Sequence, residues 1–167
     1  MKESIGATQL FMIVITLVIL FSGIVAFSIN RSNAFTVKEE LVSIIEEAGS
    51  FNIDAEIYGQ RSDGTLQKMV DILSKTGYRQ SGNCSVYEQR VNSDDERVIE
   101  VAGYQRNGQK STGNNSSAFC IVKIKGNQNR EDTTFYYQVI VFYSLDIPII
   151  KTILNFKEVG ETKILNN

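Results

Sequence analysis

The feature that most constrains this chain is an uncharged apolar run near its N-terminus. Residues 10–29 read LFMIVITLVILFSGIVAFSI, which is twenty residues without a charge. At about 1.5 Å per residue, a helix of this length extends about 30 Å, the thickness of a bilayer's hydrocarbon core. The run therefore predicts a membrane helix. The predicted membrane helix begins at Leu10, includes Ile15, Leu20 and Gly23, and ends at Ile29.

Two other structures can contain such a run. A cleaved signal peptide usually has an apolar region of about 7–15 residues that ends in a small-x-small site. This run is longer and ends in Phe27-Ser28-Ile29-Asn30. A buried core helix is the other alternative, and the position of the run so close to the N-terminus argues against it. We favour an uncleaved membrane helix over both.

The sequence that follows predicts that the helix continues outside the membrane. After the polar residues 30–33, apolar residues recur at alternating spacings of three and four, as they do on one face of a helix. This spacing predicts a stripe that packs on the rest of the chain. The stripe comprises Ala34, Val37, Leu41, Ile44 and Ala48, and it is widened by Phe35, Val42 and Ile45.

The charged residues of this segment are expected to face solvent. They are Lys38, Glu39, Glu40, Glu46 and Glu47. Gly49 occupies the position of a left-handed C-terminal cap. The pattern therefore predicts one helix over about 5–48. It also predicts two parts of the chain, a membrane segment with its polar break over 1–33 and a head over 34–167.

The rest of the head reads as an α+β domain with an antiparallel sheet. An apolar face over 65–78 predicts a short helix that Gly77 caps. From residue 85 the apolar period changes to two, with many β-branched and aromatic residues, which is typical of strands. We predict strands over 85–91, 97–104, 118–125, 133–145, 149–157 and 161–165.

One of these strands and two of the connections have distinctive compositions. The strand over 133–145 is apolar on both faces, so we expect it in the centre of the sheet with the long helix on one side. Residues 105–117 contain no large apolar side chain and are expected to form a mobile loop. Residues 126–133 are expected to form an exposed hairpin connection.

The chain contains two cysteines, Cys84 and Cys120, well separated in sequence. In a membrane-anchored domain, such a pair favours a disulfide on the oxidising side of the membrane. Two reduced, buried cysteines are the alternative. Basic residues flank the apolar run on both sides, so charge alone does not orient it. The cysteines favour a single pass through the cytoplasmic membrane, with the N-terminus on the cytoplasmic side and the head on the extracytoplasmic side.

The composition excludes several classes of function. The 17 basic and 19 acidic residues give a net charge of −2, which does not suit binding to nucleic acid through phosphates. The absence of histidine excludes Ser-His-Asp and Cys-His catalysis and histidine metal sites. Two cysteines are too few for a four-cysteine zinc site. We expect no catalytic residue, cofactor, metal or small-molecule substrate.

Two apolar segments near the ends of the chain carry a resemblance to a known family. They read FSGIVAFSINRSNAFTVKEELVSIIEE over 21–47 and LDIPIIKTILNFKEVGETKIL over 145–165. With the membrane helix and the α+β head, they resemble the type IV pilin and pseudopilin superfamily. More narrowly, the chain is similar to TadE-like minor pseudopilins of bacterial tight-adherence systems, including related membrane proteins of Gram-positive bacteria. In that family the second segment forms the last strands of the head. The resemblance implies that in this chain the segment ends in a turn at Gly160 to Lys163.

The resemblance implies a pilin-like subunit or assembly factor of a tight-adherence or type IV-like pilus or secretion system. Its partners would be membrane lipid and other pilin-like subunits or pilus assembly proteins. Most prepilins are cut after a glycine and carry glutamate as the fifth residue beyond it. Here Gly6 is the only candidate processing site, and the fifth residue after it is Phe11.

Some minor pseudopilins lack this glutamate, so cleavage after Gly6 stays an open alternative. A second hypothesis belongs to a different class of function. In it, the chain is a solitary membrane-tethered binding or sensor domain that uses residues 105–117 as its contact surface.

Overall fold

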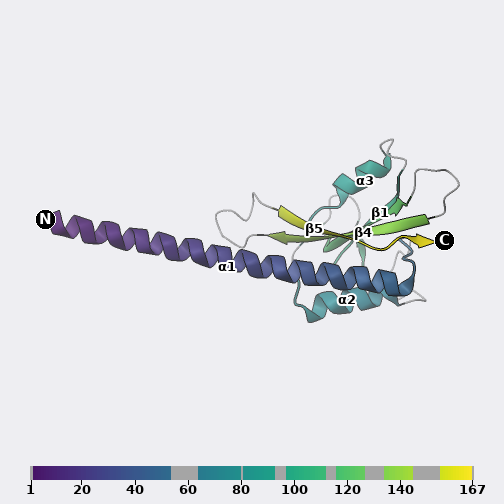
Figure 1. Cartoon of the computed structure of the whole chain (residues 1–167), viewed down its shortest axis with the longest axis horizontal. Helices are drawn as coiled ribbons and strands as arrows, with labels where there is room; N and C mark the ends of the chain where they lie inside the picture. The colour runs from purple at the N-terminus through teal and green to yellow at the C-terminus, as the bar shows by residue number, and fades with distance from the viewer. Residues whose placement is uncertain are drawn as a thin grey trace.

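The structure, a computed structural model, describes residues 2–53, 64–79, 81–92, 97–111, 116–126, 134–144 and 155–166. Its helices are α1 (Lys2–Ala48), α2 (Thr65–Lys75) and α3 (Ser85–Asn92). Its strands are β1 (Val98–Tyr104), β2 (Lys110–Ser111), β3 (Phe119–Lys125), β4 (Thr134–Ser144), β5 (Asn155–Glu161) and β6 (Leu165–Asn166). The long helix α1 packs on an antiparallel sheet (Figure 1). This is the α+β class expected from the sequence, and it is consistent with a pilin-like architecture.

Helix α1 continues without interruption through the polar residues 30–33. Its N-terminal half projects beyond the head, and its C-terminal half lies along the sheet beside α2 (Figure 1). The helix ends at Ala48, and Gly49 follows with a φ of +71°, a left-handed conformation that glycine adopts without steric cost. One helix therefore joins the apolar run to the head.

The buried face of α1 differs from the expected stripe in three places. Ala34, Val37, Leu41, Ile44 and Ile45 are buried, but Ala48 is exposed because the packing ends one turn before the helix does. Phe35 is 50% exposed, whereas Lys38 is buried with its Nζ 4.1 Å from the centre of the Phe35 ring. Relative to Ala34, position 38 lies only about 40° around the helix and position 35 about 100°. Helical geometry therefore places Lys38, and not Phe35, towards the sheet.

The sheet has the order β2-β1-β3-β4-β5, and β6 pairs with the beginning of β4. Strands β1, β3 and β4 match the predicted strands to within one residue at each end. As predicted, β4 lies inside the sheet, between β3 and β5, and packs against α1. The alternating residues Tyr137, Val139 and Val141 face the cluster formed with α1 and α2, while Ile140 and Phe142 face the other side.

The predicted strand over 85–91 is wrong, because these residues form helix α3 on the opposite face of the sheet (Figure 1). The helical turn begins where the N–H of Glu88 donates to the carbonyl of Cys84, at 3.1 Å. Cys84 and Tyr87 are both buried against the sheet, and residues three apart share a face in a helix but not in a strand. The valines that suggested a strand, Val86 and Val91, are exposed.

The predicted loop over 105–117 is also partly wrong. Within it, β2 pairs with β1 through Gly103 with Ser111 and Tyr104 with Lys110, and a tight turn at Gly108 joins the two strands. Residues 112–115 lie outside the described parts, as do most of the predicted connection over 126–133.

The two C-terminal strands are shifted from their predicted positions. β5 ends at Glu161, while residues 149–154 of the predicted strand lie outside the described residues. Gly160 belongs to β5 and does not begin a turn. A Cβ at Gly160 would lie 2.9 Å from Lys38 Cδ and 2.9 Å from Val42 Cγ2, so glycine is needed for the close approach of α1. The last strand is Leu165–Asn166, and residues 162–164, which were predicted as part of it, connect β5 to it.

Buried tyrosine hydroxyls attach the chain after α1 to the sheet. The hydroxyl of Tyr137 donates to the carbonyl of Phe51 at 2.8 Å and accepts the Phe51 N–H at 3.0 Å. The hydroxyl of Tyr104 donates to the carbonyl of Ile53 at 3.0 Å. A third hydroxyl, on Tyr78, donates to the carbonyl of Phe142, and burial raises the pKa of Tyr78 so that the proton is kept. These bonds hold the beginning of the α1–α2 connection, at Phe51 and Ile53, and the chain just after α2, at Tyr78, against the sheet.

We expect Tyr137→Phe to lower the free energy of unfolding by about 1–3 kcal/mol, because it removes two buried hydrogen bonds of Phe51. The measurement is denaturant unfolding of the full chain in mild detergent, followed by circular dichroism. Tyr136→Phe is the matched control, since Tyr136 is the preceding residue of the same strand and is only half-buried. Its expected effect is below about 0.5 kcal/mol. Equal effects of the two changes would contradict the assignment.

Candidate membrane and assembly surface

The N-terminal half of α1 presents apolar side chains that the described head does not cover. We call residues 10–26 the apolar arm. Its large apolar side chains are exposed, from 38% at Ile15 to 67% at Leu10. They surround the helix, because each of the consecutive residues from Leu10 to Val14 is at least half exposed. The arm contains Leu10, Ile15, Leu20 and Gly23 of the predicted membrane helix, and Ile29 lies just beyond it.

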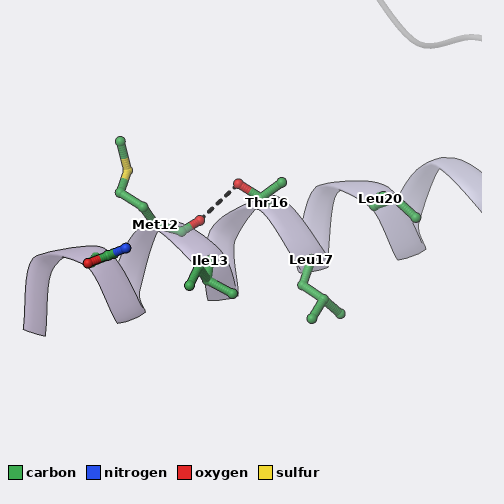
Figure 2. Close-up of a pocket in the computed structure, with 6 residues that line it drawn as sticks. Met12, Ile13, Thr16, Leu17 and Leu20 are labelled. Atoms are coloured by element: carbon green, nitrogen blue, oxygen red, sulfur yellow. Dashed lines mark hydrogen bonds between the residues drawn. The ribbon is translucent and has the colours of Figure 1, made fainter. Parts of the chain in front are cut away.

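Figure 2 shows one part of the arm at close range, with Met12, Ile13, Thr16, Leu17 and Leu20 projecting from the helix. These side chains and Gln9 border a shallow hollow. All six belong to the same helix, so the hollow is an open surface between neighbouring turns and not a cavity. Such a surface suits contact with acyl chains or another helix better than capture of a small molecule.

Two hydroxyls of the arm are satisfied within the helix itself. The hydroxyl of Thr16 donates to the carbonyl of Met12 at 2.9 Å (Figure 2), and that of Ser22 donates to the carbonyl of Val18 at 2.8 Å. In a medium without water, an unsatisfied polar group is costly. These bonds let both residues enter an apolar medium without an unpaired hydroxyl.

By length and composition, α1 is able to cross a membrane. The candidate span falls within Thr8–Ala48, and none of its most apolar stretch is buried inside the chain. Gly6 lies earlier in the same helix and is exposed, and a Cβ there would meet no atom within 4 Å. The described part of the head therefore does not cover the candidate processing site.

The described part of the head first meets α1 at Phe27. The ring of Phe27 lies 5.7 Å from that of Tyr143 and 5.3 Å from that of Phe156, between ring centres. The rings of Tyr143 and Phe156 stack at 5.2 Å, and these two residues are paired across β4 and β5. We call these three residues the aromatic collar. The sequence pattern did not reveal it, because Phe27 lies within the apolar run.

Strand β5 follows α1 in the same direction from the collar to the far end of the head. One turn after Phe27, Arg31 Nε donates to Glu158 Oε1 at 3.1 Å. At the far end, Glu46 Oε1 accepts the backbone N–H of Lys163 at 2.8 Å. The exposed ion pair of Arg31 with Glu158 contributes little stability, so the main effect of these two contacts is to fix the register of helix and strand.

The disulfide lies on the face of the sheet away from α1. It joins Cys84, just before α3, to Cys120 of β3, and both residues are almost fully buried. The alternative of two reduced cysteines is therefore not the state that the structure describes. Across the described ranges, no three histidine, cysteine, aspartate or glutamate side chains come together as a metal site.

No protein-family model, curated protein or solved structure matches this chain. The pilin-like resemblance therefore rests on residues 21–47 and 145–165 of the sequence.

Proposed function

We propose that this chain is a single-pass protein of the cytoplasmic membrane, with its N-terminus inside and its head on the extracytoplasmic side. The observation that carries the proposal is the exposure of the apolar arm on all its sides. Each large apolar side chain gains about 1.5–3 kcal/mol when it is fully buried, so the arm is stable only in an apolar environment. A bilayer provides one of matching thickness. The disulfide supports the orientation, because disulfides persist in oxidising compartments.

Within that membrane, the chain acts as a minor pilin-like subunit or assembly factor of a tight-adherence or type IV-like pilus or secretion system. Its mechanism is assembly and not catalysis. Apolar arms of several subunits pack side by side, first in lipid and then in a filament core, where close packing replaces lipid contacts. Gly23 offers a point of close approach between helices. The head, held in fixed register by Arg31 and Glu46, sets the spacing between subunits.

Photo-crosslinking in cells tests the assembly proposal. A photoreactive residue replaces Leu17, which is 49% exposed on the arm, and the matched control places it at Gln67, exposed on α2. We expect crosslinks from position 17 to other subunits with apolar N-terminal helices, at a yield well above that from position 67. Shearing the cells should release the protein together with those subunits, and the mass of the released chain shows whether it is cut after Gly6.

Crosslinks from position 17 to lipid alone, with all of the protein retained in the membrane after shearing, would show that the pilin-like proposal is wrong. The remaining explanation would then be a solitary membrane-tethered domain. No contact within the described parts of residues 105–117 favours that explanation over assembly, since β2 and its turn are used to extend the sheet.

A further inference from the structure

The head begins on α1 before the apolar run has ended. Phe27 packs on Tyr143 and Phe156, whereas Ile29 is 55% exposed on another side of the helix. The rise of an α-helix separates these two residues by only about 3 Å along the axis. The last apolar residues of the run therefore lie at the same height along the α1 axis as the first residues of the head.

Within the described residues, this overlap leaves no spacer between a bilayer and the head. The run over 10–29 is about as long as the hydrocarbon core is thick, so residues at its end lie at the edge of that core. Ile24 and Val25 are 52% and 57% exposed, and Ile29 is 55% exposed. Lifting the head clear of the lipid by one helical turn, about 5.4 Å, would expose these last apolar side chains to water.

The type of side chain along α1 changes near Phe27 in the order expected at a membrane interface. Apolar side chains come first, then the aromatic collar, and then the polar residues 30–33. Tyrosine and tryptophan are enriched where the hydrocarbon core meets the headgroups, and the collar contains Tyr143. Arg31 follows Phe27 by one turn, and its side chain is 62% exposed although Nε binds Glu158. A long cationic side chain at this position reaches the headgroup layer.

We propose that the base of the head rests in the headgroup layer of the bilayer that holds the apolar arm. The base consists of Phe27 and Arg31 of α1 with Tyr143 and Phe156 at the ends of β4 and β5. The inference rests on the proposed membrane anchor and adds that the head is seated on the lipid surface, not raised above it. The opposite end of the head, at Glu46 and Lys163, then lies about 30 Å farther along α1.

Single tryptophans test this position, because the chain contains no tryptophan of its own. The full chain is reconstituted in vesicles of phosphatidylcholine and phosphatidylglycerol that carry a nitroxide quencher on either the headgroup or the acyl chain. Phe156→Trp reports on the base, and Ile164→Trp, at a residue 62% exposed near the far end, is the control. Ile19→Trp reports on the arm itself.

We expect the headgroup nitroxide to cause about a twofold loss of fluorescence for Phe156→Trp, since an indole at this level lies among the headgroups. Ile164→Trp should lose almost none, and the acyl-chain nitroxide should quench Ile19→Trp. Each variant is first checked for its disulfide and its circular dichroism. If Phe156→Trp does not fold, Tyr143→Trp replaces it, because the two positions are paired across β4 and β5.

The other outcomes separate the two proposals. Quenching of Ile19→Trp without quenching of Phe156→Trp would overturn the seated head and leave the membrane anchor intact. Equal headgroup quenching at positions 156 and 164 would also overturn it, because the head would then lie on its side. Absence of quenching at position 19 would contradict the membrane anchor, and the inference would fail with it.

Discussion

We expect Leu41→Ala to lower the free energy of unfolding of the head by about 2–5 kcal/mol. Leu41 is fully buried in the cluster that joins α1 and α2 to the sheet. The substitution removes apolar contacts and leaves a cavity, because the surrounding helix and strands relax only partly. Leu41 belongs to the face of α1 that packs on the sheet, so the loss also loosens the head from α1.

Leu20→Ala is a matched control for this change, because it removes the same atoms from the same helix. Leu20 is 58% exposed on the apolar arm, away from the head. In detergent, its effect on unfolding of the head should stay within about 0.5 kcal/mol. Both variants are measured as full chains by denaturant unfolding in the same detergent. A comparable loss in both, or none in either, would argue against the packing of α1 on the sheet.

The second large effect is expected from Cys84→Ala combined with Cys120→Ala. The disulfide closes a loop with a sequence separation of 36 residues. Loss of a native disulfide from a small domain typically costs about 2–5 kcal/mol, mainly because the unfolded chain gains freedom. The double variant should therefore unfold at a markedly lower denaturant concentration than the unmodified chain.

A thiol reductant provides the internal control for the disulfide. It should lower the stability of the unmodified chain towards that of the double variant, and it should leave the double variant unchanged. An unfolding midpoint that does not respond to either treatment would show that the disulfide does not support the head. A strong response would fit a head that folds on the oxidising side of the membrane.

Some elements of the fold follow from local pattern, and the long helix is the clearest case. The alternating spacing from Ala34 to Ile44 describes one side of a helix, and the structure buries that side. The apolar strand β4 was equally predictable from the sequence, because a strand buried on both faces needs apolar residues at nearly every position. In both elements, burial leaves a pattern in the sequence, which is a helical period over 34–45 of α1 and a nearly continuous apolar run in β4.

Helix α3 could not be predicted from such a pattern. Among the side chains described over 84–92, only Cys84, just before the helix, and Tyr87 are buried, and Cys84 is bonded to the distant Cys120. Tyr87 also accepts a hydrogen bond from Lys157 Nζ of β5, at 2.5 Å. Two buried residues do not define a period, and the exposed valines Val86 and Val91 suggested a strand. Contacts distant in sequence determined the conformation of this segment.

The sequence by itself determined the uncharged apolar run over 10–29 and most of the side of α1 that is buried, because these depend on composition and helical period. Only the tertiary structure decided that Phe27 contacts the head, that Lys38 is buried beneath β5, and that Gly160 lies in a strand. The physical reason is that an apolar position gains similar free energy from lipid and from protein. The sequence therefore shows which side chains must leave water, and the packing of β4 and β5 shows where they go.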